Sequence, residues 1–289
     1  MFKIIFTLCL CFLATLNSFA NNEEKLRVAT VDWTVAETLL ALGVNPVGVG
    51  DVSSYNLWVK EPKINLEVTK DLGTRLQPNL ELITRLDIAL FINTPMYASL
   101  QTKLEKFAPV MTVDFTAENN IWQRISDSTL EVAKLTNNLA QGQALIVKAN
   151  QELEGLKEKL QLEPKVPIAV VQFADSKNFR LYAGNSIVGA VLERLGLENV
   201  HPEAGNLWGF VNLTIDSLAS FPENTQLVVV KPYPIDVPNK LAMNSLWNYL
   251  PLSKNVIVIP ETWTFGGIPS ALRFANLLVQ GLEGDKGQW

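Results

Sequence analysis

The chain has 289 residues and a formal net charge of −5, from 24 basic and 29 acidic side chains. Apolar residues make up 48% of it and charged residues 18%, a composition that excludes a disordered chain. The length corresponds to about two domains of roughly 150 residues each. Because proteins that follow a phosphate backbone are usually basic, the acidic balance argues against nucleic acid as a partner.

The first 20 residues predict a secretory signal peptide that is not part of the fold. Lys3 supplies a positive start, residues 4–15 form a short apolar run, and Ser18-Phe19-Ala20 has small residues where a signal peptidase reads them. The alternative is a membrane anchor, but the run is short for a hydrocarbon layer about 30 Å thick. We therefore expect cleavage after Ala20 and a periplasmic protein without a membrane anchor.

Both cysteines lie inside this predicted signal peptide. Cys11 follows Leu8-Cys9-Leu10, which does not resemble a lipid-attachment box. Removal of the 20 residues, one of them Lys3, leaves 269 residues with a net charge of −6 and no thiol. The mature protein is then expected to be stabilised by its core and not by disulfides, although the compartment permits them.

The first part of the mature chain alternates short apolar strands with helices. A capping box from Thr34 to Glu37 predicts a helix that ends at Gly43, and Pro78 predicts the first turn of a helix through Leu86. Continuous apolar strands between such helices indicate a parallel sheet covered on both faces. We predict strands over residues 26–31, 47–50, 88–92 and 110–115.

Residues 125–162 contain almost no strand signal and no proline, while leucine and isoleucine recur near helical spacing. We predict one helix to about residue 138 and a long one to about residue 161, with Gly142 as a break or a weak point. Pro164 and Pro167 end this helical segment.

Strands and helices alternate again in the last part of the chain. We predict strands over residues 168–173, 227–230 and 256–259, and helices over residues 186–195, 240–249 and 269–282. The predicted fold class is α/β, with two lobes of parallel-rich sheets flanked by helices and joined by one long connecting helix. The expected boundaries are 21–139 for the N-terminal lobe, 140–163 for the connecting helix and 164–289 for the C-terminal lobe.

The residue inventory argues against an enzyme and against a metal held by the protein itself. His201 is the only histidine, and no Gly-x-Ser-x-Gly elbow is present. One histidine and no cysteine cannot build a His-rich zinc or manganese site, so any metal is expected to arrive already chelated. Gly48-Val49-Gly50 lacks the third glycine of a dinucleotide fingerprint, with no strong helix behind it, and fits a strand end better.

Aromatic side chains lie beside the ends of several predicted strands. Trp58, Tyr97 and Trp263 each follow a strand, and Trp208 lies in a predicted loop. In an open parallel sheet, ligands bind beyond the carboxyl ends of the strands. Aromatic residues gathered at that edge favour a ligand pocket over packing alone.

Arg75 lies on a predicted loop that enters a helix. A guanidinium beside aromatic rings can donate several hydrogen bonds to the oxygens of a chelating ligand. The alternative is a surface arginine that pairs with Asp71 or Glu81.

These residues carry a resemblance to a known family. The chain resembles the periplasmic ferric-hydroxamate-binding proteins of bacterial siderophore ABC importers, from Leu26 to about Gly281. The motifs that match in order are Trp58-Val-Lys-Glu-Pro62, Gly73-Thr-Arg75 with Gln77-Pro-Asn-Leu-Glu81, Trp208-Gly209 and Pro260-Glu-Thr-Trp263. The resemblance implies two α/β lobes around a shallow cleft, a single stiff connecting helix, and therefore modest closure of the lobes on binding.

The resemblance also implies a function, which is binding and not catalysis. The protein would capture an iron(III)–hydroxamate siderophore and deliver it to an inner-membrane ABC permease with its ATPase, with no cofactor of its own. Arg75 and Tyr97 would donate hydrogen bonds to the hydroxamate oxygens around the iron. The indoles of Trp58, Trp208 and Trp263 would contact the apolar linkers of the siderophore.

Two positions of this pocket depart from the family. Phe265, also counted as a pocket residue, lies where the family can have a tyrosine, and Phe210 lies where a small hydroxyl residue can occur. Both changes make the pocket more apolar and would favour longer hydrocarbon spacers in the ligand.

Other functions stay open at this point. The same fold can hold a catecholate siderophore, haem or a corrinoid, but an anionic tris-catecholate would favour several basic residues, and beyond Arg75 only Arg180 and Lys231 are candidates. An exported α/β enzyme is a second class; it lacks a plausible acid–base pair at the strand ends, although carboxylates alone serve some hydrolases. A partner-binding protein without a small ligand is a third.

The resemblance implies an exposed acidic residue on each lobe, opposite arginines of the permease. Thr214 is a predicted helix N-cap, which places Asp216 at the second helical position, where a carboxylate also offsets the positive helix end. In the N-terminal lobe Thr102 occupies the matching place and Glu105 is a nearby substitute. A monomer is expected.

Overall fold

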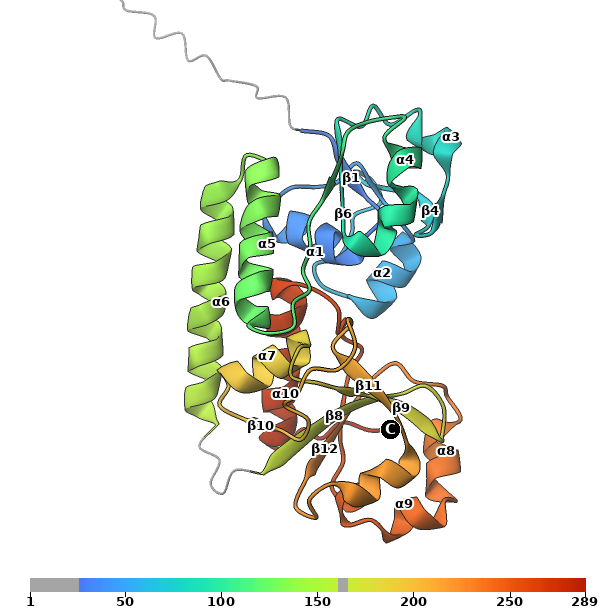
Figure 1. Ribbon diagram of the computed structural model, residues 1–289, viewed down its shortest axis with the longest axis vertical. Coiled ribbons are helices and arrows are strands. Elements are labelled where there is room, and N and C mark those ends of the chain that lie inside the picture. The colour runs from blue at the N-terminus through green and yellow to red at the C-terminus, as the bar shows by residue number, and fades with distance from the viewer. Residues whose placement is uncertain (1–25, 161–165) are drawn as a thin grey trace, which may run out of the picture.

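The computed structural model describes residues 26–160 and 166–289, and the predicted signal peptide lies outside them. Two lobes are arranged one above the other, each built around its own sheet (Figure 1). The N-terminal lobe has a wholly parallel sheet in the order β3–β2–β1–β6–β7. Its strands are β1 (Val28–Thr30), β2 (Gly48–Val49), β3 (Lys70–Asp71), β6 (Leu90–Asn93) and β7 (Val110–Thr112). The four strands predicted for this lobe are confirmed, and β3 was not predicted.

The helices of this lobe begin at other residues than the sequence predicts. In α1 (Trp33–Ala41) the N-cap is Asp32, whose side chain accepts hydrogen bonds from the backbone of Thr34 and Val35. The predicted capping box is therefore wrong, and Glu37 is free to reach another element. A helix also opens behind β2, against expectation, as α2 (Val52–Trp58). The remaining helices are α3 (Leu80–Ile83), η1 (Pro95–Leu100) and α4 (Gln101–Leu104).

Pro78 does not open a helix. It lies in β5 (Gln77–Pro78), which pairs with β4 (Gly73–Thr74) in a two-stranded antiparallel hairpin, and Asn79 caps α3 instead. The hairpin loop consists of Arg75 and Leu76, so Arg75 stands at a hairpin tip and not on a loop that enters a helix.

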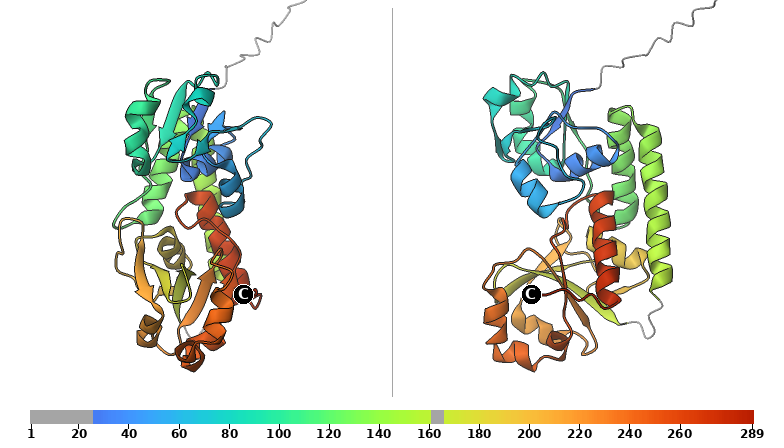
Figure 2. Two further views of the ribbon diagram at one scale, coloured as in Figure 1. Left: turned by 90° about the vertical axis from the view of Figure 1, so that its right-hand side faces the viewer. Right: turned by 180° about the vertical axis from the view of Figure 1, so that it is seen from behind.

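The long helical segment forms two antiparallel helices, α5 (Ile121–Leu135) and α6 (Leu139–Lys159), as predicted. Gly142 does not break α6. A Cβ atom on Gly142 would lie 2.7 Å from the Cβ of Ala133, so the glycine allows α5 and α6 to approach closely. Figure 2 shows α6 running alongside both lobes.

The C-terminal lobe has a mixed sheet in the order β11–β9–β8–β12–β13, with β10 paired to β8. The predicted strands correspond to β8 (Pro167–Phe173), β12 (Gln226–Val230) and β13 (Ile257–Ile259). The antiparallel strands β9 (Asn178–Tyr182) and β11 (Phe210–Thr214) and the short β10 (Glu198–Asn199) were not predicted. Only Phe210 of β11 is buried, and exposed residues alternate with partly buried ones along the rest of the strand. This is the pattern of a strand with one solvated face and not of a buried parallel strand.

Helices cover this second sheet. Ser186 caps α7 (Ile187–Arg194) as predicted, while the helix predicted over residues 240–249 is two shorter ones, because Asn244 caps a new helix inside it. These are α8 (Val237–Ala242) and α9 (Ser245–Tyr249), followed by η3 (Pro251–Lys254). The other helices of the lobe are η2 (Ile215–Ser220) and the closing helix α10 (Ile268–Leu282).

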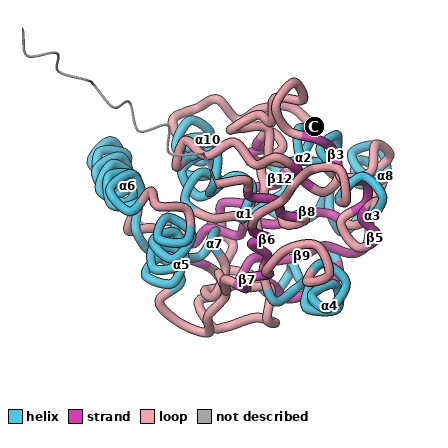
Figure 3. Tube along the Cα trace, turned by 90° about the horizontal axis from the view of Figure 1, so that it is seen from above, coloured by secondary structure: helices cyan, strands magenta, loops and turns pink. Residues whose placement is uncertain are grey.

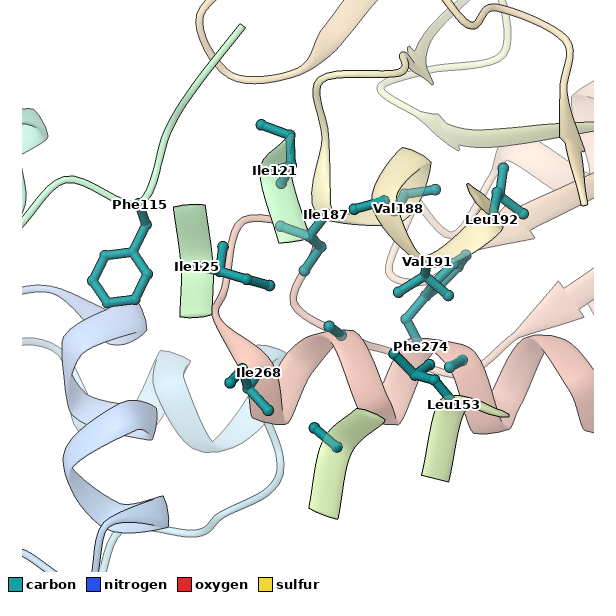
Figure 4. Packing of buried hydrophobic residues seen from close by; sticks show 14 of the residues in the cluster. Phe115, Ile121, Ile125, Leu153, Ile187, Val188, Val191, Leu192, Ile268 and Phe274 are labelled. Carbon is teal, nitrogen blue, oxygen red and sulfur yellow. The ribbon is translucent and has the colours of Figure 1, made fainter. Parts of the chain in front are cut away.

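One apolar core joins the two lobes through helices. Seen from above, α5, α6 and α10 lie together on one side of the two sheets (Figure 3). Ile125 of α5, Ile187 of α7 and Ile268 of α10 point toward one another in this core (Figure 4). The connecting helix is therefore supported by two neighbours. The lobe boundaries expected from the sequence stay a prediction.

Candidate functional site

A cavity of about 340 Å³ lies between the lobes, at the carboxyl ends of β1 and β6. The chain leaves these adjacent parallel strands in opposite directions across the sheet, which is where ligands bind in open α/β sheets. Residues of both lobes line it, among them Asp32, Arg75, Asp114, Trp208, Trp263 and Phe265.

Arg75 reaches the cavity from the tip of the β4–β5 hairpin. Its guanidinium lies 3.8 Å from the ring centroid of Trp33 and 5.8 Å from that of Trp263. Its Nη1 donates a 2.9 Å hydrogen bond to the hydroxyl of Tyr97. Glu81 pairs with Arg85 instead. The guanidinium is thus fixed by stacking and one hydrogen bond, with other N–H groups left for a ligand.

Tyr97 lies behind Arg75 and does not line the cavity. Only 2% of Tyr97 is exposed, and this burial raises the pKa of its phenol above the usual value. The hydroxyl therefore stays protonated, and as acceptor of the Arg75 N–H it orients the guanidinium. This differs from the direct ligand contact that the resemblance implied.

Three tryptophans and a phenylalanine form the aromatic wall. The ring centroid of Trp263 lies 5.0 Å from that of Trp33 and 5.2 Å from that of Phe265, both edge to face. Trp33 was not predicted, although its position directly after β1 is the signal that marked the other aromatic residues. Its indole N–H donates to the carbonyl of Gly50, so the ring that supports Arg75 is itself anchored.

Trp58 joins this wall from a neighbouring hollow. It lies edge to face with Trp263, with centroids 6.3 Å apart, but lines a separate hollow of about 270 Å³. That hollow also contains Gln172, Arg180 and Tyr233 of the C-terminal lobe. The structure therefore brings Arg75, Trp208, Trp263 and Phe265 into one cavity and places Trp58 beside it.

The C-terminal lobe presents Trp208 on a tight loop. The side-chain oxygen of Asn206 accepts hydrogen bonds from the backbone N–H groups of Trp208 and Phe210. Gly209 adopts φ +76°, a conformation that favours glycine. Phe210 is buried behind Phe265, with ring centroids 6.0 Å apart, so Phe265 is the departure from the family that reaches the cavity surface.

The segment that carries Trp263 and Phe265 is tied to α1 across the lobes. The hydroxyl of Thr34 donates to the carbonyl of Phe265 at 2.9 Å. Glu37 accepts hydrogen bonds from the backbone N–H of Gly267 and the hydroxyl of Ser270, both at 2.5 Å. Complete burial raises the pKa of Glu37 to about 8, and these hydrogen bonds oppose the rise. α1 thereby supplies the cap of α10 from the other lobe.

The predicted docking residues lie outside the cavity. Asp216 is exposed at the second position of η2, with Thr214 as N-cap, where the sequence placed it. The pKa of Asp216 is lowered, mainly because the Thr214 hydroxyl donates a hydrogen bond to it. Thr102 lies in α4, and Glu105 is the first residue after that helix. The Glu105 carboxylate accepts a hydrogen bond from the side-chain amide of Gln101.

The cavity can hold an uncharged ligand with apolar surface and a few oxygen acceptors. Its charged lining groups are the two carboxylates of Asp32 and Asp114 and the guanidinium of Arg75. Within residues 26–160 and 166–289, no group of three or more His, Cys, Asp or Glu side chains could hold a metal ion. In the same residues no helix is both long and apolar enough to cross a bilayer.

Known proteins are similar to this chain in sequence and in architecture. The iron(3+)-hydroxamate-binding protein FhuD of Escherichia coli (strain K12) is 26% identical over 260 residues, covering 89% of this chain and 87% of that protein. The Fe(3+)-citrate-binding protein YfmC of Bacillus subtilis (strain 168) is 25% identical over 250 residues, covering 85% and 77%. The crystal structure of FhuD from Vibrio cholerae with Fe3+–Desferal bound matches with a TM-score of 0.83 at 27% identity, covering 90% and 98%.

The family model for periplasmic binding proteins matches residues 28–259, most of the chain. The relationship predicted from the aromatic and arginine motifs is confirmed. With the two-lobed α/β fold and the cavity between the lobes, this places the chain in a class of binding proteins for transport and not of enzymes. The chain belongs to the periplasmic binding protein family.

Proposed function

We propose that the protein captures an iron(III)–hydroxamate siderophore in the cavity between its lobes and delivers it to an inner-membrane ABC permease and its ATPase. The observation that carries this proposal is the arrangement of Arg75 on Trp33 and against Tyr97, at the edge of the aromatic wall. It presents fixed N–H donors to oxygen acceptors beside apolar surface, which suits a chelate with oxygen ligands inside and hydrocarbon linkers outside.

The charge of the cavity supports hydroxamate over catecholate. Three hydroxamate anions around iron(III) give a neutral complex, whereas a tris-catecholate complex carries three negative charges. Two carboxylates and one guanidinium line the cavity, so a trianion would meet net repulsion. The iron stays in the chelate, since the described residues offer no metal site.

One observation favours the alternative of an anionic chelate. Arg180 in the neighbouring hollow lies 4.9 Å from the ring centroid of Phe210 and 5.8 Å from that of Phe265. A ligand that bridged both spaces would contact two guanidinium groups. The relative named for Fe(3+)-citrate keeps this class of ligand in consideration. The single histidine, His201, does not line the cavity, which weighs against haem.

Tryptophan fluorescence of the mature protein tests the proposal, because Trp208 and Trp263 line the cavity and Trp33 packs against Trp263. Ferrioxamine B and ferrichrome are expected to quench the fluorescence with saturable curves at low micromolar concentration or below. Ferric enterobactin, ferric citrate, haemin and cobalamin serve as competitors. Tight binding of ferric enterobactin or ferric citrate without binding of either hydroxamate would contradict the proposal.

We further propose export with cleavage after Ala20, which gives a monomeric periplasmic protein that starts at Asn21. The charged start, the short apolar run and the small residues before the cleavage site support it. Intact-mass measurement of the exported protein checks it: a retained N-terminus or an acylated Cys11 would contradict it.

Docking onto the permease is assigned to Asp216, with Glu105 as the counterpart on the other lobe. The exposure of Asp216 and its carboxylate, which stays ionised because the pKa is lowered, support this role. Asp216→Asn keeps the size of the side chain and is expected to leave siderophore binding intact while transport in cells falls. Normal transport at limiting protein level would leave Asp216 with a structural role at the start of η2 only.

A further inference from the structure

The two carboxylates of the cavity differ in how many of their oxygens already accept hydrogen bonds within the fold. Both oxygens of Asp32 accept hydrogen bonds within the fold, from the backbone of Thr34 and Val35 and from the hydroxyl of Thr94. In Asp114, Oδ1 accepts from the backbone and the hydroxyl of Thr116, whereas Oδ2 accepts from none of the described residues. Asp114 also forms no ion pair with a described Lys or Arg side chain. It is the free anionic acceptor of the cavity.

Asp114 is held in place by its own backbone. It follows β7 by two residues, and its carbonyl accepts a 2.5 Å hydrogen bond from the hydroxyl of Ser128 in α5. Val113 and Phe115 on either side belong to the buried core. An acceptor fixed in this way loses little conformational entropy when it binds a ligand, so its interaction energy is not offset by ordering.

Apolar side chains line the same cavity as this carboxylate. Phe115, Ile121 and Ile187 line the cavity and belong to the core, and Figure 4 shows them along one stretch of it. Methylene groups of a ligand would pack against these residues. The combination of an apolar lining with a free carboxylate matches an alkyl chain that ends in a protonated amine.

We propose that Asp114 binds the ammonium group at the end of an alkyl arm, so that the protein prefers a cationic ferric hydroxamate over a neutral one. The neutral iron core would lie at Arg75 and the aromatic wall, and the single positive charge of the arm would lie at Asp114. This inference rests on the proposed binding of ferric hydroxamates and adds the charge of the preferred ligand.

The chemistry of the two groups sets the expected size of the preference. An alkyl ammonium has three N–H donors and no acceptor, and it is charged at neutral pH like the side chain of lysine. A charge-assisted hydrogen bond in a half-buried site that is partly screened by solvent corresponds to a preference of about three- to tenfold. Screening by salt is expected to reduce it.

Two ligands that differ only at the amine test the proposal on the unmodified mature protein. Ferrioxamine B carries the free ammonium, and its N-acetylated form has the same chelate with a neutral amide there. Fluorescence titration is expected to give about three- to tenfold tighter binding of ferrioxamine B at low salt, with a smaller ratio in 0.5 M salt. Equal affinities for the two ligands would overturn the proposal.

Substitution then assigns the preference to one residue. Asp114→Asn is expected to remove the difference between the two ligands, because it weakens the binding of ferrioxamine B more than that of the acetylated form. Asp127→Asn, which removes an equal charge on the exposed side of α5, is the matched control and is expected to retain the preference. A preference that persists in Asp114→Asn would overturn the assignment. If the unmodified protein binds neither of these ligands nor ferrichrome, the proposed function fails as well, so the two failures are distinguishable.

Discussion

The side chain of Arg75 is preorganised for ligand binding. The two-residue loop of the β4–β5 hairpin carries it to the cavity, Trp33 supports one face of the guanidinium, and Tyr97 accepts one of its N–H groups. Stacking and a fixed partner reduce the rotamer entropy that a free arginine would lose on binding. The remaining N–H groups of Arg75 can therefore donate to a ligand with little loss of conformational entropy.

Replacing Arg75 by alanine is expected to weaken ferric-hydroxamate binding by about 1.5–3 kcal/mol, the range for hydrogen bonds to charged groups. Arg85→Ala is the control, because Arg85 is an exposed arginine that pairs with Glu81 on α3. Fluorescence titration of both variants, with circular dichroism to check folding, measures the difference. Equal affinities of the two variants would remove Arg75 from the site.

Tyr97 gives a second prediction at this scale. If the hydroxyl acts by holding Arg75, Tyr97→Phe should cost less than Arg75→Ala, about 0.5–1.5 kcal/mol of binding free energy. In the double variant Tyr97→Phe/Arg75→Ala the loss of the hydroxyl should then have no further effect. Additive losses would instead indicate that the hydroxyl contacts the siderophore itself.

At the scale of elements, the joint between α1 and α10 determines where the aromatic wall lies. Glu37 of α1 accepts from the first residues of α10, and Thr34 holds the carbonyl of Phe265. From the other side, the hydroxyl of Tyr182 lies 2.7 Å from that of Thr264. The segment with Trp263 and Phe265 is thus held between the two lobes, which keeps the cavity preformed.

This joint predicts a pH dependence of stability. Burial raises the pKa of Glu37 to about 8, with the carboxylate of Asp32 adding to the rise, so the folded protein keeps a proton that the unfolded chain has released above pH 4.5. Stability therefore falls as pH rises from about 4.5 to 8, by at most about 1.4 kcal/mol per pH unit from this group. Urea unfolding at pH 5, 6.5 and 8 should show a steeper fall for the unmodified protein than for Glu37→Gln. Parallel pH profiles of the two proteins would contradict this assignment.

Two glycines of α6 form a matched pair for packing. A Cβ on Gly142 would meet Ala133 of α5 at 2.7 Å, whereas nothing lies within 4 Å of a Cβ on Gly155. Gly142→Ala is expected to lower the free energy of unfolding by about 1–3 kcal/mol through overpacking. Gly155→Ala is expected to raise it by about 0.5–1 kcal/mol, because alanine favours the helix. Chemical denaturation measures the free energy of unfolding of both variants, and the two changes are expected to have opposite signs.

For the molecule as a whole, the contacts between the lobes point to small movement. α6 runs along both lobes with α5 and α10 beside it (Figures 1 and 2), and Lys60 pairs with Glu261 at 2.8 Å across the lobes. Opening the cavity widely would break this ion pair and the contacts of Glu37 together. We therefore expect only modest closure on binding.

Small-angle X-ray scattering with and without ferrioxamine B tests this rigidity. The radius of gyration is expected to be the same for the two states within the error of measurement. As a reference, disruption of the joint in Glu37→Ala should increase the difference between them. A clear compaction of the unmodified protein on binding would show that the lobes move as hinged bodies.

The sequence by itself determined the parts that depend on local pattern. Apolar runs identify β1, β6, β8, β12 and β13, and helical periodicity identifies α5, α6 and α10. The aromatic and arginine motifs identify Arg75, Trp208, Trp263 and Phe265, four of the residues that line the cavity. These signals are readable because side-chain period and strand-end position are properties of neighbouring residues.

Only the tertiary structure decided which distant residues meet. Glu37 looked like part of a capping box but joins α10 some 230 residues away, Trp58 lies beside the cavity, and Trp33 supports Arg75. Asp114 gave no signal in the sequence, since a lone aspartate after a strand has many uses. Its free oxygen is defined by the absence of partners among the described residues, and partners are set by packing over long chain separations and not by local pattern.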